Sequence, residues 1–379
     1  MEIPFNPSTG SSLGIEWELE LVDRQSRELT PAAIEILEAI TPEGAEEHPS
    51  AKHELLQSCI EVVTGVCQTV GEAKEDLQRS VAEVAAAADP LGVGLMCSGT
   101  HPLSRYQDQL ISPKERYQEL VENMQWLARR MAIFGVHVHV GVKSKEKVIP
   151  IVNALTQYIP HFLALSASSP FWAGDDTGLA SARSKIFEGL PTAGLPYQLD
   201  DWPEFELYME TLIDTKTVDS IREVWWDIRP HPNFGTIELR VCDGLPTIEE
   251  VGAVAALSQS LVTMLDREID RGYSLPKPRG WVVRENKWRA ARYGLDAEIV
   301  VDNIRTLRPV REALLDLAEE LMPTARRLGC EDDLASIEKI IDTGGSYQRQ
   351  RRAFDESGGD VPAVVDLLLE EMRVGLFPQ

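Results

Sequence analysis

The stretch Gly14-Ile15-Glu16-Trp17-Glu18-Leu19-Glu20 alternates apolar and acidic residues, and this period of two predicts a β-strand. Side chains at positions i and i+2 of a strand share one face. Glu16 and Glu18 therefore point one way, while Ile15, Trp17 and Leu19 point the other way, toward an apolar layer. We expect a sheet with one acidic face.

Two later stretches repeat this alternation. Gly135-Val136-His137-Val138-His139-Val140-Gly141 places two histidines on one face, and Thr236-Ile237-Glu238-Leu239-Arg240-Val241 pairs an acid with an arginine. Their apolar flanks are unlike the lysine and serine of an exposed edge strand. Each pattern alone also fits a solvent-facing edge or two hydrogen-bonded histidines, but the three together favour a functional site.

Hard oxygen ligands combined with imidazole suit Mg²⁺ or Mn²⁺ better than a closed zinc site. The predicted ligands are Glu16, Glu18, Glu61, Glu238 and one of the strand histidines. Carboxylates gathered on one face repel each other unless cations neutralise them, so the cluster itself argues for bound metal. Because Mg²⁺ is commonly shared with substrate phosphates, we also expect phosphate chemistry.

Arginines that could neutralise a transferring phosphoryl group are present at Arg229 and Arg240. The basic run Arg284-Glu285-Asn286-Lys287-Trp288-Arg289-Ala290-Ala291-Arg292 is a further candidate, and it fits a solvated helix equally well. The chain has no GxxxxGK[ST] loop and no GxGxxG after a strand, so a nucleotide site here would have to be built around metal.

The composition narrows the function further. The 379 residues hold 37 basic and 61 acidic side chains, a net charge of −24 that repels nucleic acid. We find no uncharged apolar run of about 18 residues and no signal peptide, and expect a cytoplasmic protein with no membrane partner. The five cysteines lack CxxC spacing, so we expect reduced thiols, those at Cys59, Cys67 and Cys242 in the core.

Hydrophobic periodicity predicts the remaining elements. Strands are expected at 13–22, 56–66, 91–98, 135–141, 224–229 and 235–242. Helices are expected at 32–40, 70–88, 113–134, 147–166 with an interruption near Pro160, 248–270, 297–328 and 361–377. No linker divides the chain, so we predict one α+β domain over residues 1–379, mostly helical from about residue 247.

Seven motifs in order resemble the type 2 glutamate–cysteine ligases, also called carboxylate–amine ligases of the YbdK type. They are Gly14-Ile15-Glu16-Trp17-Glu18, Glu61 to Val66, Gly99-Thr100-His101-Pro102, Gly135 to Gly141, Ser166 to Gly178 with Ser181 and Arg183, Trp225 to Pro230, and Gly235 to Arg240. The resemblance covers most of the chain. It implies a glutamine-synthetase-like fold, in which a curved, mainly antiparallel sheet carries the metal ligands on its concave face and helices cover its back.

The same resemblance implies an activity and roles for individual residues. ATP would phosphorylate a carboxylate, the γ-carboxylate of glutamate, and an amine such as cysteine would attack the acyl phosphate to give an amide. Glu16, Glu18 and His137 resemble metal ligands, with Glu61 and Glu238 as further acids, while His139 would lie nearer the nucleotide phosphates. Arg240 resembles the arginine that steadies the transferring phosphoryl group.

Further residues are candidates for binding the two substrates. Arg183, Arg229, Thr177 and Ser181 are candidates for the carboxylate substrate, since arginine can hold a carboxylate with two hydrogen bonds. Lys287 and Arg289 are candidates for the nucleotide phosphates.

Two other functions remain open. A metal-dependent hydrolase could use the His137–His139 pair to hold a metal-bound water, although few further histidines follow that pair. A nucleotide-binding regulator without catalysis would need the charged residues for binding alone. The family does not fix the acceptor amine, and a homodimer is expected only because it is the commonest closed assembly.

Overall fold

The centre of the molecule is a seven-stranded sheet. The computed structural model describes residues 2–301 and 305–376. The strand order is β2-β3-β1-β5-β9-β8, with β4 paired to the far half of β1, and every pairing is antiparallel. The strands are β1 Leu13–Asp23, β2 Ala51–His53, β3 Cys59–Val63, β4 Val93–Met96, β5 Val136–Gly141, β8 Ile228–His231 and β9 Thr236–Leu239.

Helices and two small hairpins complete the described chain. The hairpins pair β6 Phe171–Trp172 with β7 Asp175–Asp176, and β10 Glu298–Val300 with β11 Leu307–Pro309. The helices are α1 Ala33–Ile40, α2 Val70–Ala88, α3 Glu115–Met124, α4 Trp126–Arg129, α5 Lys145–Leu155, α6 Ile159–Ser166, α7 Ala182–Phe187, α8 Trp202–Asp214, α9 Ile248–Asp270, α10 Gly280–Tyr293, α11 Val310–Leu328, α12 Glu331–Thr343, α13 Ser346–Glu356 and α14 Val361–Arg373.

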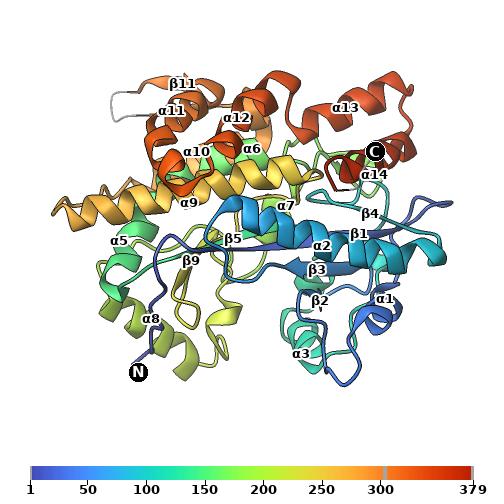
Figure 1. The fold of residues 1–379 in the computed structure, drawn as a ribbon, viewed down its shortest axis with the longest axis horizontal. Helices are drawn as coiled ribbons and strands as arrows, with labels where there is room; N and C mark the ends of the chain where they lie inside the picture. The colour runs from blue at the N-terminus through green and yellow to red at the C-terminus, as the bar shows by residue number, and fades with distance from the viewer. Residues whose placement is uncertain (1, 302–304, 377–379) are drawn as a thin grey trace.

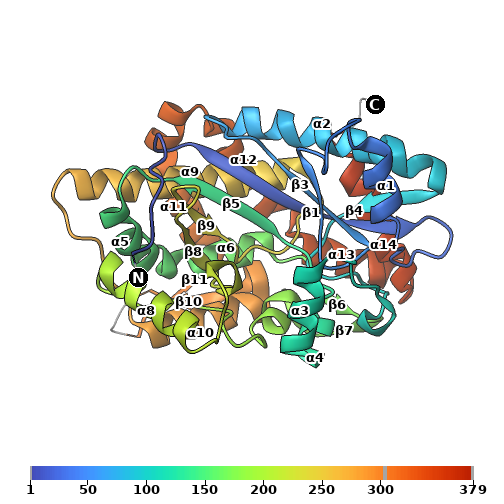
Figure 2. The same cartoon turned by 90° about the horizontal axis from the view of Figure 1, so that it is seen from below.

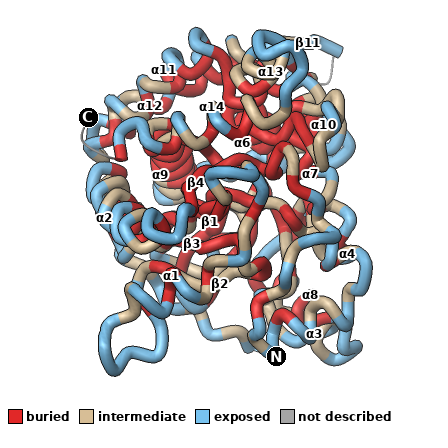
Figure 3. The backbone as a smooth tube through the Cα atoms, turned by 90° about the vertical axis from the view of Figure 1, so that its right-hand side faces the viewer, coloured by how far each residue is buried: buried red, intermediate tan, exposed pale blue. Residues whose placement is uncertain are grey.

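The apolar face of the sheet packs against helices. Helices α2, α5 and α9 contact its strands, and Figure 1 shows α9 lying along the sheet with α11 and α12 beyond it. Ile15, Trp17 and Leu19 on β1 are fully buried in this layer, as predicted, and the Trp17 indole Nε1 donates to the carbonyl of Leu245 at 3.0 Å. Figure 3 shows buried residues running through α9, β1 and β3.

The other face of the sheet carries the acids and histidines. Figure 2 views the molecule from below, with β1, β3 and β5 crossing the centre of the view and α8 and α3 both drawn below them. The mixture of helices and an open, mainly antiparallel sheet is the predicted fold class.

Several helix boundaries agree with the sequence prediction, and two predicted helices do not. Helices α2 and α9 have the predicted bounds, and a short 3-10 turn, Thr156–Tyr158, interrupts the 147–166 helix just before Pro160. The continuous helix predicted over residues 113–134 is wrong. It begins at Glu115 and breaks at Gln125, whose φ of +51° cannot continue an α-helix, and α4 ends at Arg129.

The strand predicted over 224–229 begins later, at Ile228. The reason lies in Arg229, whose Nη1 donates to the carbonyls of Ile221, Arg222 and Val224, each at 3.2 Å. Those carbonyls turn toward the guanidinium group instead of toward a neighbouring strand, and residues 221–223 form a 3-10 turn. The predicted strands at 56–66 and 91–98 are confirmed in shorter form.

The helix predicted over 297–328 is wrong in its first part. Residues 298–300 and 307–309 pair as a hairpin, and α11 starts only at Val310. Ile299, Val300 and Val301 are β-branched, and the Asn286 side chain bonds both the N–H and the carbonyl of Val300 as a neighbouring strand would. Residues 302–304 of that prediction, and Phe377 at the end of the 361–377 helix, lie outside the described residues.

Two helical stretches, Lys145–Ser166 and Ile248–Asp270, are long and apolar enough by composition to cross a membrane. In each, 83% of the most apolar window is buried inside the protein, as in the core helix of a globular fold. All five cysteines are free and buried, as expected.

Candidate active site

Sheet register brings the predicted metal ligands together. Glu16 lies opposite His137 across β1 and β5, and Glu18 lies opposite Glu61 across β1 and β3. His139 lies opposite Glu238 across β5 and β9. Directly opposed residues of an antiparallel pair share a face, so segments more than 200 residues apart in sequence form one polar surface.

Two groups on this surface have the spacing of metal ligands. Glu16, His137 and Glu238 form one, and Glu18, Glu61 and His137 form the other; within each group the donor atoms lie within 4.8 Å of one another. The Nε2 atom of His137 is buried without a hydrogen-bond partner. Carboxylate oxygens with an orphaned imidazole nitrogen fit a hard divalent cation such as Mg²⁺ or Mn²⁺.

The acids of this surface fall into two groups, one with raised and one with lowered pKa values. Burial raises the pKa of Glu18 to about 8, and the nearby Glu54 adds to the rise. Burial, followed by repulsion from Glu16, raises the pKa of Glu61 well above its ordinary value. These carboxyls favour the protonated form at neutral pH, because desolvation and like charge both disfavour the anion.

Glu238 and Glu16 behave in the opposite way. Burial alone would raise the pKa of Glu238, but the guanidinium groups of Arg229 and Arg240 outweigh burial and lower it far below its ordinary value. Burial is likewise overcome at Glu16, where His139 and His137 lower the pKa. Both carboxylates are therefore anionic at neutral pH.

Glu238 is held by both predicted arginines. Its Oε2 accepts from Arg229 Nε at 2.9 Å and Nη2 at 2.7 Å, a two-point contact, while its Oε1 accepts from Arg240 Nη1. The Nε of Arg240 is buried without a partner. Arg229 is therefore fully engaged, whereas Arg240 retains a donor for another anion.

His139 connects Glu16 to the end of the sheet. Its Nε2 lies 3.2 Å from Glu16 Oε1 and its Nδ1 lies 3.0 Å from Thr236 Oγ1. Burial lowers its pKa, but Glu238 and Glu16 more than compensate, so the pKa is raised. The ring is thus a potential cation beside the acids.

Two acids and one arginine of this surface, Glu20, Glu54 and Arg116, were not predicted from the sequence. Glu20 follows Glu16 and Glu18 on the same strand face, and the i, i+2, i+4 spacing could have revealed it. It is fully buried, its Oε1 accepts from the Ser98 N–H and hydroxyl, and burial raises its pKa to about 8. Glu54 and Arg116 interact electrostatically beside Glu61, but they belong to no motif that could have marked them.

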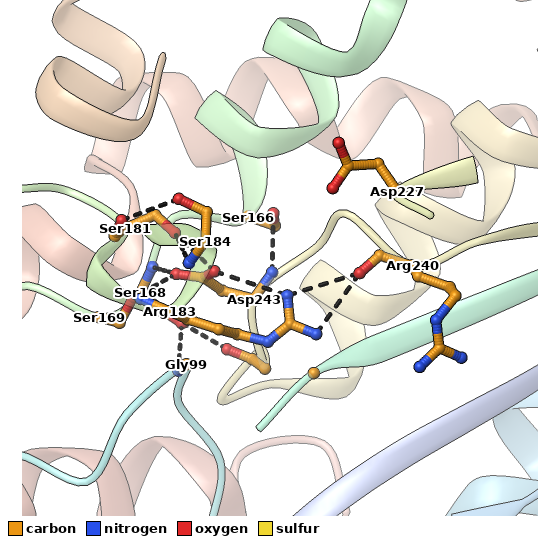
Figure 4. Close-up of polar contacts among 12 residues, drawn as sticks. Gly99, Ser166, Ser168, Ser169, Ser181, Arg183, Ser184, Asp227, Arg240 and Asp243 are labelled. Carbon is orange, nitrogen blue, oxygen red and sulfur yellow. Dashed lines mark hydrogen bonds and ion pairs between the residues drawn. The ribbon is translucent and has the colours of Figure 1, made fainter. Parts of the chain in front are cut away.

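Of the four predicted carboxylate-binding residues, Arg229 lies on β8, and Thr177, Ser181 and Arg183 lie on and after the 166–178 loop. The Thr177 hydroxyl donates to the Pro170 carbonyl at 2.8 Å, and the Ser181 hydroxyl donates to Asp243 at 2.8 Å, so both are already engaged. Arg183 lies under Arg240, with its Nη1 and Nη2 3.5 and 3.4 Å from the Arg240 carbonyl and its buried Nε without a partner (Figure 4). Only Arg183 of these three has a buried donor without a partner.

The two candidates for nucleotide phosphates have other partners than the residues of the acid face. The acid face is the sheet surface that carries Glu16, Glu18, Glu61, His137, His139 and Glu238. The Lys287 ammonium is buried between Asp227, at 2.6 and 2.9 Å, and Glu188, at 2.6 Å. Arg289 contacts Glu285 on its own helix and the Glu298 carbonyl. Among the described residues, neither side chain forms a hydrogen bond or ion pair with the two groups that have the spacing of metal ligands, called the metal-type groups below.

Solved structures identify the class to which this fold belongs. A glutamate–cysteine ligase from Francisella tularensis, solved in complex with AMP, matches with a TM-score of 0.70 and 12% identity, over 98% of this chain and 91% of that one. A bifunctional glutathione synthetase from Pasteurella multocida matches with a TM-score of 0.69 and 14% identity, over 97% of this chain and 52% of that longer protein. The fold is that of the glutamine-synthetase-like ligases, as predicted.

Sequence comparison narrows the class to a family. Residues 12–367 match the model of glutamate–cysteine ligase family 2. The chain is also 61% identical over 376 residues, 99% of its own length and 98% of the relative, to a Frankia alni protein named "Putative glutamate–cysteine ligase 2-1". The chain belongs to glutamate–cysteine ligase family 2 and is an enzyme of the carboxylate–amine ligase type.

Proposed function

We propose that the protein is an ATP-dependent ligase that activates the γ-carboxylate of glutamate as an acyl phosphate and joins it to an amine. The observation that carries this proposal is the acid face, where two metal-type groups share His137 and two arginines hold the Glu238 carboxylate. A surface of this kind suits a reaction between anions.

The chemistry explains why both signs of charge are needed. A carboxylate is a poor electrophile, and transfer of a phosphoryl group to it provides a leaving group that an amine can displace. Mg²⁺ or Mn²⁺ held by Glu16, Glu18, Glu61, His137 and Glu238 would screen the phosphate and carboxylate from each other. The nucleotide found in the Francisella tularensis enzyme supports ATP as the phosphoryl donor.

The residues of this chain then divide the work. Arg240 keeps an unpaired donor and stabilises charge on the transferring phosphoryl group, while Arg229 fixes Glu238 beneath it. His139, whose pKa is raised by Glu238 and Glu16 despite burial, would supply positive charge toward the phosphates of the nucleotide. Arg183 has a buried, unpartnered Nε for the carboxylate substrate.

The test is release of ADP and phosphate from ATP, Mg²⁺ and glutamate, with amines, including cysteine, added one at a time. We expect ADP formation that depends on the amine and gives one amide per ADP. The matched control omits ATP and offers amide substrates with metal alone. Hydrolysis in that control, with no ATP consumed, would assign the metal-type groups to a hydrolase instead.

A further inference from the structure

A buried carboxylate lies behind the acid face, three residues beyond Arg240. Asp243 is fully buried, and its Oδ2 accepts from the Ser168 N–H at 3.0 Å and the Ser169 hydroxyl at 2.7 Å. Its Oδ1 accepts from the Ser181 hydroxyl at 2.8 Å. Figure 4 shows these donors converging on Asp243 from one loop.

The same segment leads into α7, which carries Arg183. The Ser169 hydroxyl also accepts from the Arg183 N–H at 3.0 Å, and Ser181 caps the first turn of α7, which contains Arg183. The Arg183 Nη1 lies 4.0 Å from Asp243 Oδ1, so the guanidinium group is the main positive charge close to this carboxylate. Asp243 therefore binds the two serines that hold the start of α7 and also lies in ion-pair range of the Arg183 charge.

The packing around Asp243 and Arg183 is close. A Cβ atom on Gly135, at the start of β5, would overlap the Arg183 guanidinium group, and a Cβ on Gly99 would lie 2.7 Å from the Asp243 carboxylate. The Gly99 N–H donates to the Ser168 hydroxyl at 2.8 Å, which ties the same loop to the segment after β4. Three separate segments thus meet around Asp243.

Burial of so many polar groups needs a reason. Burial raises the pKa of Asp243. The Arg183 charge opposes this rise most strongly, and the serine hydrogen bonds oppose it less. An apolar residue could join these segments without that desolvation penalty. A carboxylate here instead favours one direction of the guanidinium group, because its charge lies 4.0 Å from Arg183 Nη1 while the group also faces the Arg240 carbonyl just after β9.

We propose that Asp243 is a positioning residue of the ligase reaction, which acts through Arg183 and orients its guanidinium group toward the carboxylate substrate. This role rests on the proposed function. It predicts that loss of the Asp243 charge affects binding of glutamate and not binding of ATP.

The first test is Asp243→Asn, which keeps the shape and removes the charge. We expect the KM for glutamate to rise by roughly tenfold or more, as for loss of a hydrogen bond to a charged group, with the KM for ATP unchanged. Arg183→Gln should raise the KM for glutamate as well, and the double variant should be no worse than Arg183→Gln alone, because the two changes act on one interaction.

Glu250→Gln is the matched control. Glu250 is a buried acid on α9 that forms an ion pair with Arg349 of α13 at 2.9 Å. It contacts none of the residues that donate hydrogen bonds to Asp243. We expect it to lower thermal stability and leave both KM values unchanged. Additive effects of Asp243→Asn and Arg183→Gln, or equal rises in both KM values, would overturn the proposal.

Hydrogen exchange gives a reading that does not need the proposed function. Asp243→Asn should speed exchange of the Ser168 and Arg183 amides, and Ser181→Ala, a milder change if Asp243→Asn fails to fold, should speed it less. Unchanged exchange in both variants would refute the anchoring role even if glutamate is not the substrate. Faster exchange without ATP turnover in the wild-type protein would reject the ligase function and, with it, the role of Asp243 in that reaction.

Discussion

The two faces of the central sheet are built from neighbouring residues with opposite effects on stability. Trp17 and its alternate neighbours on β1 are buried against helices and stabilise the fold. Glu18, one residue away, places a carboxyl where burial and the nearby Glu54 disfavour its charged form, while Glu16, on the other side, stays charged only because His139 and His137 offset its burial. The comparison teaches that one strand can serve stability and chemistry at once, through side-chain parity alone.

The largest expected effect is on the acid face. Glu16→Gln removes a charge from a metal-type group while keeping the shape of the side chain. We expect kcat/KM to fall by about 1,000-fold or more, since a metal ligand acts in the transition state. Thermal stability should fall only modestly, because His137 and His139 lose their carboxylate partner while the fold is kept. Steady-state kinetics and a melting curve measure the two effects. Normal turnover by this variant would exclude Glu16 as a ligand.

The neighbouring residue should show the reverse. Trp17→Ala removes a fully buried ring and the hydrogen bond from its indole to Leu245. We expect the free energy of unfolding to fall by about 3–5 kcal/mol, while the KM for ATP of the folded fraction is retained. Denaturant titration gives the first quantity. If Trp17→Ala instead lost activity without losing stability, the two faces would not be functionally separate.

A third change separates binding from support at Lys287. Lys287→Met leaves Asp227 and Glu188 as buried acids without their cation. Breaking such a cluster should lower the free energy of unfolding by about 3–5 kcal/mol, with little change in the KM for ATP. The more exposed Arg289→Met provides the comparison and should change neither quantity. A selective rise in the KM for ATP would restore Lys287 to the nucleotide site.

The smallest expected effect is a pH dependence away from the acid face. Burial lowers the pKa of His161 to about 4, so the unfolded chain binds a proton there that the folded chain excludes. This proton uptake does not affect the free energy of unfolding above about pH 6.5, and it lowers that free energy as the pH falls toward 4. The loss is about 2 kcal/mol at pH 5.

His161→Gln removes this titration. The free energy of unfolding should then differ less between pH 7.5 and pH 5 than it does in the wild-type protein. Denaturant titrations at both pH values test this, and an unchanged difference would show that His161 takes no part in the acid sensitivity.

Alternation made the acid face predictable from sequence. Period two in β1, β5 and β9 gave both faces correctly, and family motifs supplied the fold. The partners across strands were not predictable, because register depends on where each strand begins. Asp243 and Glu54 also escaped prediction, since neither repeats with a period, and the partners of Lys287 come from distant segments.

The sharing of His137 between two groups of acids has a chemical consequence. A neutral imidazole has one N–H and one lone pair, so this ring can ligate one cation at a time. Whichever group gains the ring leaves the other with two carboxylates. A cation in that second group would then have to complete its coordination with water or with oxygen atoms of a substrate.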